Sequence, residues 1–280
     1  MLLNSRTDIA SEAGKRLSEE LGKEKGVIAR KSLIRGLPVL DVKVVSGEGA
    51  KLIGKPVGQY FTLELGRCGD EFFNDAVFAL SELISRLLPS VSPRCSLVAA
   101  LGNPDITPDA LGQLTASSIL VTRHLKAHAP SDFVSFSSVA LCRTGVLGTS
   151  GVESAVQIKT LCREIKPELV IAVDALAGSD PDMLCRCIQI SDTGIAPGSG
   201  VGNSREELSP KSLGLPVISI GVPTVIDAAA FSADKNVSSM FVTPRDIDSL
   251  VRSAARIIGF GINLALHPGL SIEDVELLLG

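Results

Sequence analysis

Short apolar runs alternate along this chain with longer stretches of helical periodicity. Residues 95–101, between Pro93 and Gly102, form a compact apolar run that predicts a strand buried on both faces. Residues 166–173 and 216–222 have the same character, and the apolar positions within 151–165 are spaced as in a helix. This alternation favours an α/β fold.

The remaining pattern adds further elements. A broad apolar stripe over residues 71–88 predicts an amphipathic helix, and residues 39–45 and 60–65 read as strands that precede the main sheet. Thr243-Pro244 and Ser271 with Asp274 predict two helix starts near the carboxyl end. Because no linker interrupts the pattern, we expect one domain over residues 1–280.

Asp109 follows the first of these strands. Thr107 is suited to cap a helix, Pro108 to occupy its first position, and Asp109 then falls in the first turn. Open α/β sheets bind ligands beyond the carboxyl ends of their strands, so this is a candidate functional position. Taken alone, a first-turn aspartate more often only stabilises its helix.

Asp174 interrupts the second apolar run at the point where a strand ending is expected. It lies 174 − 109 = 65 residues after Asp109, about two strand-helix repeats, so neighbouring strands can bring the two carboxyl groups to one edge. Two adjacent carboxylates cannot both ionise cheaply. We expect Asp109, near the positive end of a helix, to be ionised and Asp174, on an apolar strand, to keep a proton.

Composition narrows the choice of function. A net charge of −4, from 27 basic and 31 acidic residues, argues against direct binding of nucleic acid. No apolar run approaches the length of a membrane-spanning helix, and the first residues lack a signal peptide's pattern, so we expect a cytoplasmic protein. The glycine-rich residues 197–203 lack the lysine of a phosphate-binding loop, although a nucleotide-binding module remains the non-enzymatic alternative.

Metal and thiol chemistry find little support. The six cysteines show no metal-binding spacing, and a thiol nucleophile needs a histidine partner that none of them has nearby in sequence. His124 and His128 share a helical face, but Leu125 stands where a zinc protease has glutamate. We therefore predict no metal and no cofactor.

Nine segments, in order along nearly the whole chain, resemble the germination protease family. They are Arg6-Thr-Asp-Ile-Ala, Gly54-Lys-Pro-Val-Gly, Leu101-Gly-Asn with Thr107-Pro-Asp-Ala-Leu-Gly, Val121-Thr-Arg-His-Leu, Ala172-Val-Asp-Ala-Leu, Gln189-Ile-Ser-Asp-Thr-Gly-Ile, Pro197-Gly-Ser-Gly-Val-Gly-Asn, Gly221-Val-Pro-Thr-Val and Leu266-His-Pro. The resemblance implies a fold similar to that of hydrogenase maturation endopeptidases. This is a phosphorylase/hydrolase-like three-layer sandwich with a mostly parallel central sheet, helices on both faces and a small β-rich N-terminal elaboration.

The resemblance also implies an activity. It is that of an aspartic-type endopeptidase that degrades small acid-soluble spore proteins in the spore interior during germination, with Asp109 and Asp174 as the catalytic pair. Supporting or substrate-binding roles are expected for Asn103, Thr107, Asp192, Gly198 and Gly200. We expect a homo-oligomer. A metal-dependent endopeptidase of the hydrogenase maturation type is the second enzymatic candidate, which cleavage in excess chelator would distinguish.

The resemblance further implies a precursor that removes its own leader. The family's substrates share an acidic residue, Ile or Phe, Ala, a variable residue and Glu, and Asp8-Ile9-Ala10-Ser11-Glu12 fits this pattern. The self-processing bond is thus expected between Asp8 and Ile9, with residues 1–8 as the leader. This leader is shorter than the family's usual one, and a frayed terminus is the other interpretation.

Overall fold

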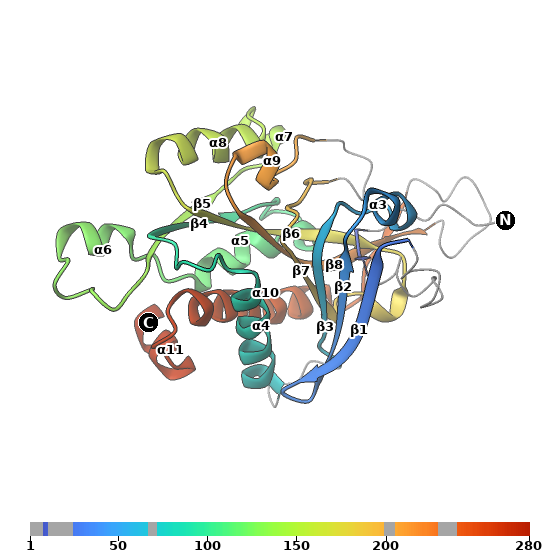
Figure 1. Ribbon diagram of the computed structural model, residues 1–280, viewed down its shortest axis with the longest axis horizontal. Coiled ribbons are helices and arrows are strands. Elements are labelled where there is room, and N and C mark those ends of the chain that lie inside the picture. Colours follow the sequence, from blue (N-terminus) through green and yellow to red (C-terminus); the bar gives the residue numbers. More distant parts are fainter. Residues whose placement is uncertain (1–7, 11–24, 67–71, 199–204, 229–239) are drawn as a thin grey trace.

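The computed structural model describes residues 8–10, 25–66, 72–198, 205–228 and 240–280. Within these ranges the chain alternates strands and helices (Figure 1). The strands are β1 (Val27–Ile34), β2 (Leu37–Val44), β3 (Gly58–Glu64), β4 (Cys95–Ala100), β5 (Ser138–Arg143), β6 (Leu169–Gly178), β7 (Cys187–Ser191), β8 (Val217–Asp227) and β9 (Phe241–Val242). The α-helices are α3 (Gly47–Ile53), α4 (Phe73–Leu87), α5 (Leu111–Thr115), α6 (Arg123–His128), α7 (Leu147–Ser150), α8 (Ser154–Ile165), α9 (Pro210–Leu213), α10 (Ile247–Leu266) and α11 (Ile272–Leu279). The 3₁₀ turns are η2 (Thr107–Asp109), η3 (Ala116–Ser118) and η4 (Pro181–Met183).

All the described strands belong to one mixed sheet. Its order is β1-β2-β3-β7-β8-β6-β4-β5, with β9 paired to β8. The pairs β8-β6, β6-β4 and β4-β5 are parallel, whereas β1-β2, β2-β3, β3-β7, β7-β8 and β8-β9 are antiparallel. The expected α/β class is correct, but the expectation of a mostly parallel sheet is wrong.

The strands predicted at 39–45 and 60–65 exist, but they are not a separate elaboration. As β2 and β3 they continue the main sheet, because β7 inserts between β3 and β8 and pairs antiparallel with both. β8 thus has a parallel neighbour on one side and an antiparallel neighbour on the other. This change of pairing direction lies in the middle of the sheet.

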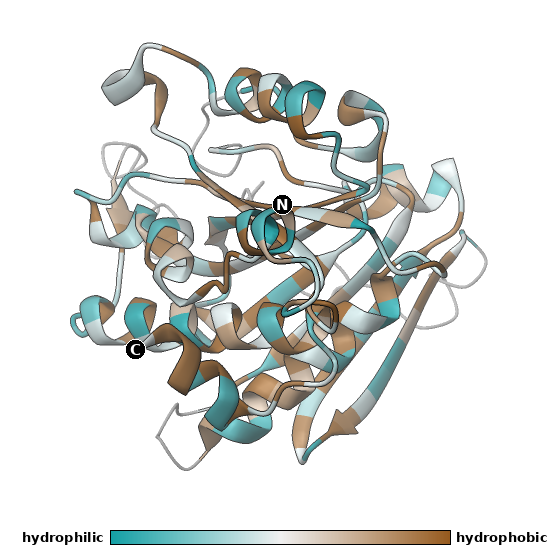
Figure 2. Ribbon diagram, turned by 90° about the vertical axis from the view of Figure 1, so that its left-hand side faces the viewer, coloured by the Kyte–Doolittle hydropathy of each residue, from teal (hydrophilic) through white to brown (hydrophobic). Residues whose placement is uncertain are grey.

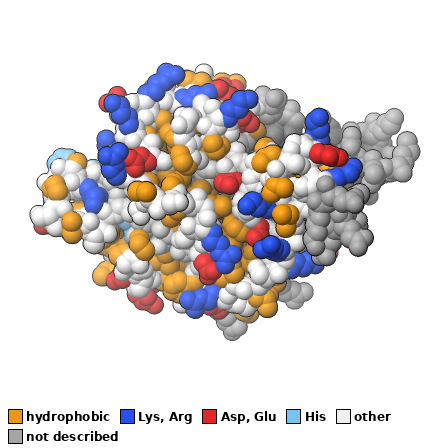
Figure 3. All heavy atoms as spheres, viewed as in Figure 1, with side chains coloured by type: hydrophobic (Ala, Val, Ile, Leu, Met, Phe, Trp, Pro, Cys, Tyr) orange, Lys and Arg blue, Asp and Glu red, His pale blue; other side chains and the backbone are white. Residues whose placement is uncertain are grey.

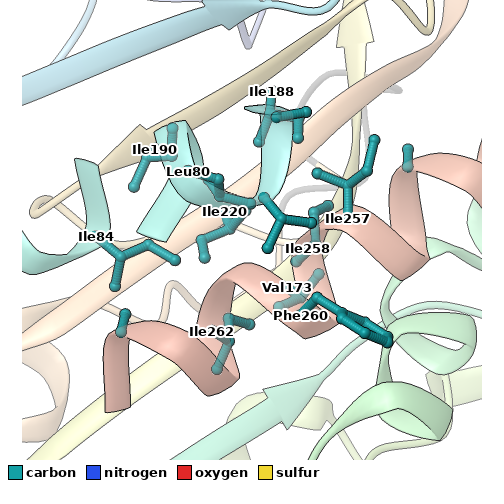
Figure 4. Packing of buried hydrophobic residues seen from close by; sticks show 14 of the residues in the cluster. Leu80, Ile84, Val173, Ile188, Ile190, Ile220, Ile257, Ile258, Phe260 and Ile262 are labelled. Atoms are coloured by element: carbon teal, nitrogen blue, oxygen red, sulfur yellow. The ribbon is translucent and has the colours of Figure 1, made fainter. Parts of the chain in front are cut away.

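One face of the sheet packs against α4 and α10, and we call it the α10 face. Figure 4 shows Leu80 and Ile84 of α4 meeting Ile257, Ile258 and Ile262 of α10 above strand residues. Every second residue of the central strands contributes to this cluster, among them Val173, Ile188, Ile190 and Ile220. The predicted helix at 71–88 corresponds to α4, and its apolar stripe is the part that is buried here.

The opposite face is covered at both ends, and we call it the α8 face. At the parallel end, Ala155 and Ile158 of α8 pack on Val170 and Ala172 of β6. At the antiparallel end, Ile53 of α3 joins a smaller cluster that also contains Ala10, Val42 and Tyr60. Figure 2 shows helices on either side of the sheet, with hydrophilic and hydrophobic stretches alternating along them.

Helix α10 is long and apolar enough to cross a membrane, contrary to the expectation that no segment would be. Most of it is buried inside the structure, as expected for the core helix of a globular fold. Its buried Asn263 accepts a hydrogen bond from the Leu120 N–H at 3.0 Å and donates one to the Ser118 carbonyl oxygen at 2.7 Å. This polar contact fixes α10 against the segment that follows α5.

Two strands run further than predicted. β6 continues past Asp174 to Gly178, and β8 continues beyond the predicted apolar run of residues 216–222 to Asp227. The added residues of β6 and β8 pair with each other, since the β6-β8 pairing includes β6 residues Val170 to Gly178 with one irregularity after Leu176. Asp174 therefore lies within a strand, not at its end.

Candidate functional site

A cavity of about 480 Å³ opens on the α8 face, between the two clusters that cover that face. Both aspartates singled out from the sequence line it, together with Asp8, Gly198 and Arg205. Walls come from the turn after β4, from β6 and β8, and from the start of α8. The two carboxyl groups thus come together in one cavity, although Asp174 lies within β6 and not at the strand end where it was expected.

Asp174 is the more deeply buried of the two, with 3% of its surface exposed. It alternates with Val170 and Ala172 along β6, so its side chain lies on the α8 face. Burial raises the pKa of Asp174 well above its ordinary value, and the neighbouring Asp109 carboxylate raises it further. The Ala175 N–H, which donates to Oδ1 at 3.0 Å, opposes this only in part. The site therefore favours the protonated form of Asp174.

Asp109 is half-buried at the end of η2 and is held by a tight turn. The Asn103 N–H donates both to the Asp109 carbonyl oxygen, at 3.1 Å, and to its carboxylate Oδ2, at 2.9 Å. Burial raises the pKa of Asp109, while the Asn103 hydrogen bond and the charge of Arg205 lower it. Of the two carboxyl groups, Asp109 thus has more support for the ionised form.

The turn requires glycine at position 102. Gly102 has φ +94°, and a Cβ built there would lie 1.9 Å from the Asp109 carbonyl oxygen. Close by, Gly112 of α5 sits against β6, where a Cβ would lie 2.4 Å from the Val173 carbonyl oxygen. These two close approaches bring the segment that carries Asp109 next to the strand that carries Asp174.

The predicted cap at Thr107 is wrong. Thr107 is the first residue of the η2 turn, and Ile106 precedes it without a side-chain cap. The Thr107 hydroxyl instead donates to Asp248 Oδ1 of α10 at 2.8 Å. In the same turn, the Pro108 carbonyl oxygen accepts a hydrogen bond from Thr224 Oγ1 of β8 at 2.6 Å. The turn is short because its polar groups are directed to α10 and β8 and not into a longer helix.

Of the other residues expected to support the site, some lie at the cavity and some do not. Asn103 acts through its N–H, as described, and Gly198 lines the cavity in a left-handed conformation with φ +71°. Asp192 does not line this cavity. Its carboxylate accepts a hydrogen bond from the Gln59 N–H at 2.7 Å and lines a different depression on the antiparallel half. Gly200 lies outside the described residues.

The segment of residues 8–10 lies against the edge of the cavity. The Asp8 N–H donates to the Ala177 carbonyl oxygen of β6 at 2.9 Å, and the Ala177 N–H donates to Asp8 Oδ2 at 3.0 Å. Ile9 and Ala10 are fully buried. Both residues expected at a self-processing bond, Asp8 and Ile9, are thus held in place, Asp8 within the same cavity as the aspartate pair.

Sequence reasoning missed two residues of this region. Arg205 lines the cavity and lowers the pKa of both Asp109 and Asp174 through its charge. Gln189 of β7 contacts residues 8–10 through its side-chain amide. Both come from segments remote from the aspartates, and the only sequence signal is that Gln189 begins one of the nine motifs.

Among the residues that the structure describes, no group of three or more His, Cys, Asp or Glu side chains is placed to hold a metal ion. In α6, His128 Nδ1 lies 2.8 Å from the His124 carbonyl oxygen. On the face of the molecule in Figure 3, basic and acidic side chains of the described residues are interspersed.

Comparison with known proteins establishes the class. The sequence profile of the germination proteases, a peptidase family, matches residues 4–239. A germination protease of Clostridium perfringens is 36% identical over 329 residues, covering 99% of this chain and all of that protein. One of Caldanaerobacter subterraneus is 38% identical over 326 residues, covering 100% of this chain and 99% of that protein. The molecule is therefore a peptidase.

The chain belongs to the germination protease family, and its role is that of a spore protease. The resemblance inferred from the nine motifs is confirmed. Among solved structures, the chain is similar to a NiFe hydrogenase maturation protease from Thermococcus kodakarensis, with a TM-score of 0.37 and 17% identity, over 66% of this chain and 98% of that one.

Proposed function

We propose that this protein is an endopeptidase that cleaves small acid-soluble spore proteins during germination and that Asp109 and Asp174 activate the attacking water. The observation that carries the proposal is that both carboxyl groups line one cavity, where the Asp109 charge adds to the raised pKa of Asp174. A pair of this kind holds one shared proton over a range of pH, which supplies a base and an acid together.

The proposed step balances with one water and one proton held by the pair. Asp109 accepts a proton from water as the water oxygen adds to the peptide carbonyl carbon, and the carbonyl π pair moves to oxygen. The carbon–nitrogen bond then breaks while the nitrogen takes the proton of Asp174. The products are a carboxyl group and an amine, and the pair has exchanged roles. General acid-base catalysis of this type contributes about 10²- to 10⁴-fold.

Self-processing at the Asp8-Ile9 bond is part of the proposal. Support comes from the two hydrogen bonds that join Asp8 to Ala177, three residues beyond Asp174 on the same strand. It also comes from the complete burial of Ile9, because a specificity pocket for an apolar residue has to exclude water from it. In this interpretation residues 8–10 occupy the site as a substrate does.

The aspartate pair is tested by Asp109→Asn and Asp174→Asn in the full chain. The substrate is a synthetic peptide with the sequence of residues 4–16, and Asp132→Asn, at an exposed position outside the cavity, is the matched control. We expect kcat to fall by at least about 10²-fold in each cavity variant and to stay at the wild-type level in the control. Near-normal turnover in either cavity variant would remove that residue from the mechanism.

Two further measurements address the proton and the leader. The wild-type kcat/KM should follow a bell-shaped pH profile with apparent pKa values that belong to the pair, and a flat profile through the acid range would contradict a shared proton. Amino-terminal sequencing after a mild acid shift should find Ile9 first. An intact Met1 under every condition would contradict self-processing.

The oligomeric state and the location are also part of the proposal. Light scattering on the purified protein tests the proposed homo-oligomer, and fractionation of spores tests the proposed location in the spore interior.

A further inference from the structure

The side chain of Gln189 is placed by the register of three neighbouring strands. Asp174 of β6 pairs with Gly221 of β8, and Gly221 pairs with Gln189 of β7. Residues in one such row have their side chains on the same face, about 5 Å apart from strand to strand. The Asp174 carboxyl group and the Gln189 amide thus face the α8 side on either side of Gly221, and the Leu176 side chain lies over this glycine, where a Cβ would come within 2.6 Å of it.

Residues 8–10 are bound at the β7 end of this row through the Gln189 amide. Nε2 donates to the Asp8 carbonyl oxygen at 2.8 Å, and Oε1 accepts a hydrogen bond from the Ala10 N–H at 2.5 Å. The second contact fixes the orientation of the amide, because the Ala10 N–H is only a donor and has to face an oxygen. Nε2 is thereby directed to the carbonyl group of Asp8.

That carbonyl group has a special position. If the chain is cut between Asp8 and Ile9, as the proposed function states and this inference assumes, the Asp8 carbonyl carbon is the atom that water attacks. Its oxygen then carries the negative charge of the tetrahedral intermediate. The Gln189 Nε2 donor on β7, 2.8 Å from this carbonyl oxygen in the intact chain, lies beside the atom on which that charge develops.

Two backbone donors of β6 close to Asp8 have other acceptors. The Ala177 N–H donates to the Asp8 side chain, and the Ala175 N–H donates to Asp174. The Gln189 amide supplies the Asp8 carbonyl oxygen with a donor that these two N–H groups do not. We infer that Gln189 is a catalytic residue that polarises the scissile carbonyl group and, through the N–H two residues further on, aligns the substrate backbone.

The proposed chemistry uses only the groups already named. As water adds to the Asp8 carbonyl carbon, the π pair moves to the oxygen that accepts from Gln189 Nε2, and the released proton goes to Asp109. When the bond to the Ile9 nitrogen breaks, the electron pair on that oxygen forms the carbonyl double bond of the new carboxyl group again. The Ile9 nitrogen takes a proton from Asp174. Gln189 donates a hydrogen bond throughout and transfers no proton.

The test compares Gln189→Met and Gln189→Glu with the wild type in the full chain. Gln157→Glu is the matched control, since this α8 glutamine donates to the Val152 carbonyl oxygen and to Ser150 Oγ on the surface. Steady-state kcat and KM are measured on the peptide of residues 4–16, and thermal unfolding checks that each variant folds. Asp174→Asn is included to monitor the proposed function itself.

We expect Gln189→Met to lower kcat by about 10²- to 10³-fold and to raise KM by less than about tenfold, since the lost hydrogen bond strengthens as charge develops. In Gln189→Glu, kcat relative to the wild type should recover as pH falls through the glutamate pKa, because the protonated carboxyl group again offers a donor. A merely structural role would not produce this recovery.

The outcomes separate the two proposals. If the wild type cleaves and Asp174→Asn does not, but Gln189→Met keeps kcat within about threefold, the inference is wrong and the proposed function stands. Should Gln189→Met fail to fold, the absence of acid recovery in Gln189→Glu overturns the inference. A wild type that cleaves neither the peptide nor its own chain overturns both.

Discussion

Gln113 provides the sharpest test of how the site is held. This buried residue of α5 donates through Nε2 to the carbonyl oxygens of Thr144, at 2.7 Å, Ala100, at 3.0 Å, and Gly102, at 3.3 Å. Ala100 ends β4, Gly102 starts the turn to Asp109, and Thr144 follows β5. A single amide thus joins the ends of two parallel strands to the helix that follows Asp109.

Replacing Gln113 by Met keeps the length of the side chain and removes the donor. The Ala100 oxygen retains the Thr144 N–H at 3.0 Å and the Thr144 hydroxyl at 3.2 Å. The Gly102 and Thr144 oxygens lose the amide in a buried setting, at about 1–3 kcal/mol each. The free energy of unfolding should therefore fall by about 2–6 kcal/mol, which for a chain of this size lowers Tm by about 3–10 °C.

The assay is thermal unfolding followed by circular dichroism. Gln157→Met is the control, because the Gln157 amide makes the same kind of contacts at the protein surface, where water replaces them. We expect the control to stay within about 0.5 kcal/mol of the wild type. Equal Tm values for the Gln113 and Gln157 variants would refute the reasoning that the buried carbonyl groups depend on this amide.

Two other predictions concern stability. Burial, together with the charge of Lys126, lowers the pKa of His267 from 6.5 to about 4, so the unfolded chain binds the extra proton between these values. The free energy of unfolding should be independent of this group above about pH 6.5 and fall by up to about 3 kcal/mol toward pH 4, and urea titrations should show a smaller acid loss in His267→Phe. Gly112→Ala, whose Cβ would lie 2.4 Å from the Val173 carbonyl oxygen, should cost at least about 1–3 kcal/mol, whereas Gly148→Ala, with nothing within 4 Å, should change urea stability little; equal effects would contradict the close packing of α5 on β6.

The local parts of the fold could be predicted from the sequence. β4, α4, and the capping box formed by Ser271 and Asp274 at the start of α11 all appear where the periodicity and the cap residues place them. Each depends on neighbours within a few residues, so a local pattern specifies it. The position of Asp109 in a first turn was predictable for the same reason, although the turn is 3₁₀ and Thr107 does not cap it.

The features that the sequence did not predict depend on contacts between residues distant in sequence. Asp174 looks like a strand end because a carboxyl group interrupts the apolar run, yet β6 continues since β8 offers backbone partners beyond it. The antiparallel half could not be predicted because β7, five residues long, sits between strands from opposite ends of the chain. Arg205 lines the cavity and Gln189 contacts residues 8–10 at its edge, and both depend on chain segments distant in sequence, so no local pattern predicts either contact.

The change of pairing direction at β8 has a mechanical consequence. Proteases built from two lobes adapt to a substrate by hinge movement, in which the lobes rotate about a flexible connection. Here the row from Asp174 through Gly221 to Gln189 crosses from the parallel to the antiparallel half through unbroken backbone pairing. Rotating one half of the sheet against the other would break the backbone hydrogen bonds between these strands. The described part of the sheet therefore resists such a rotation, and a substrate has to adopt a conformation that fits it.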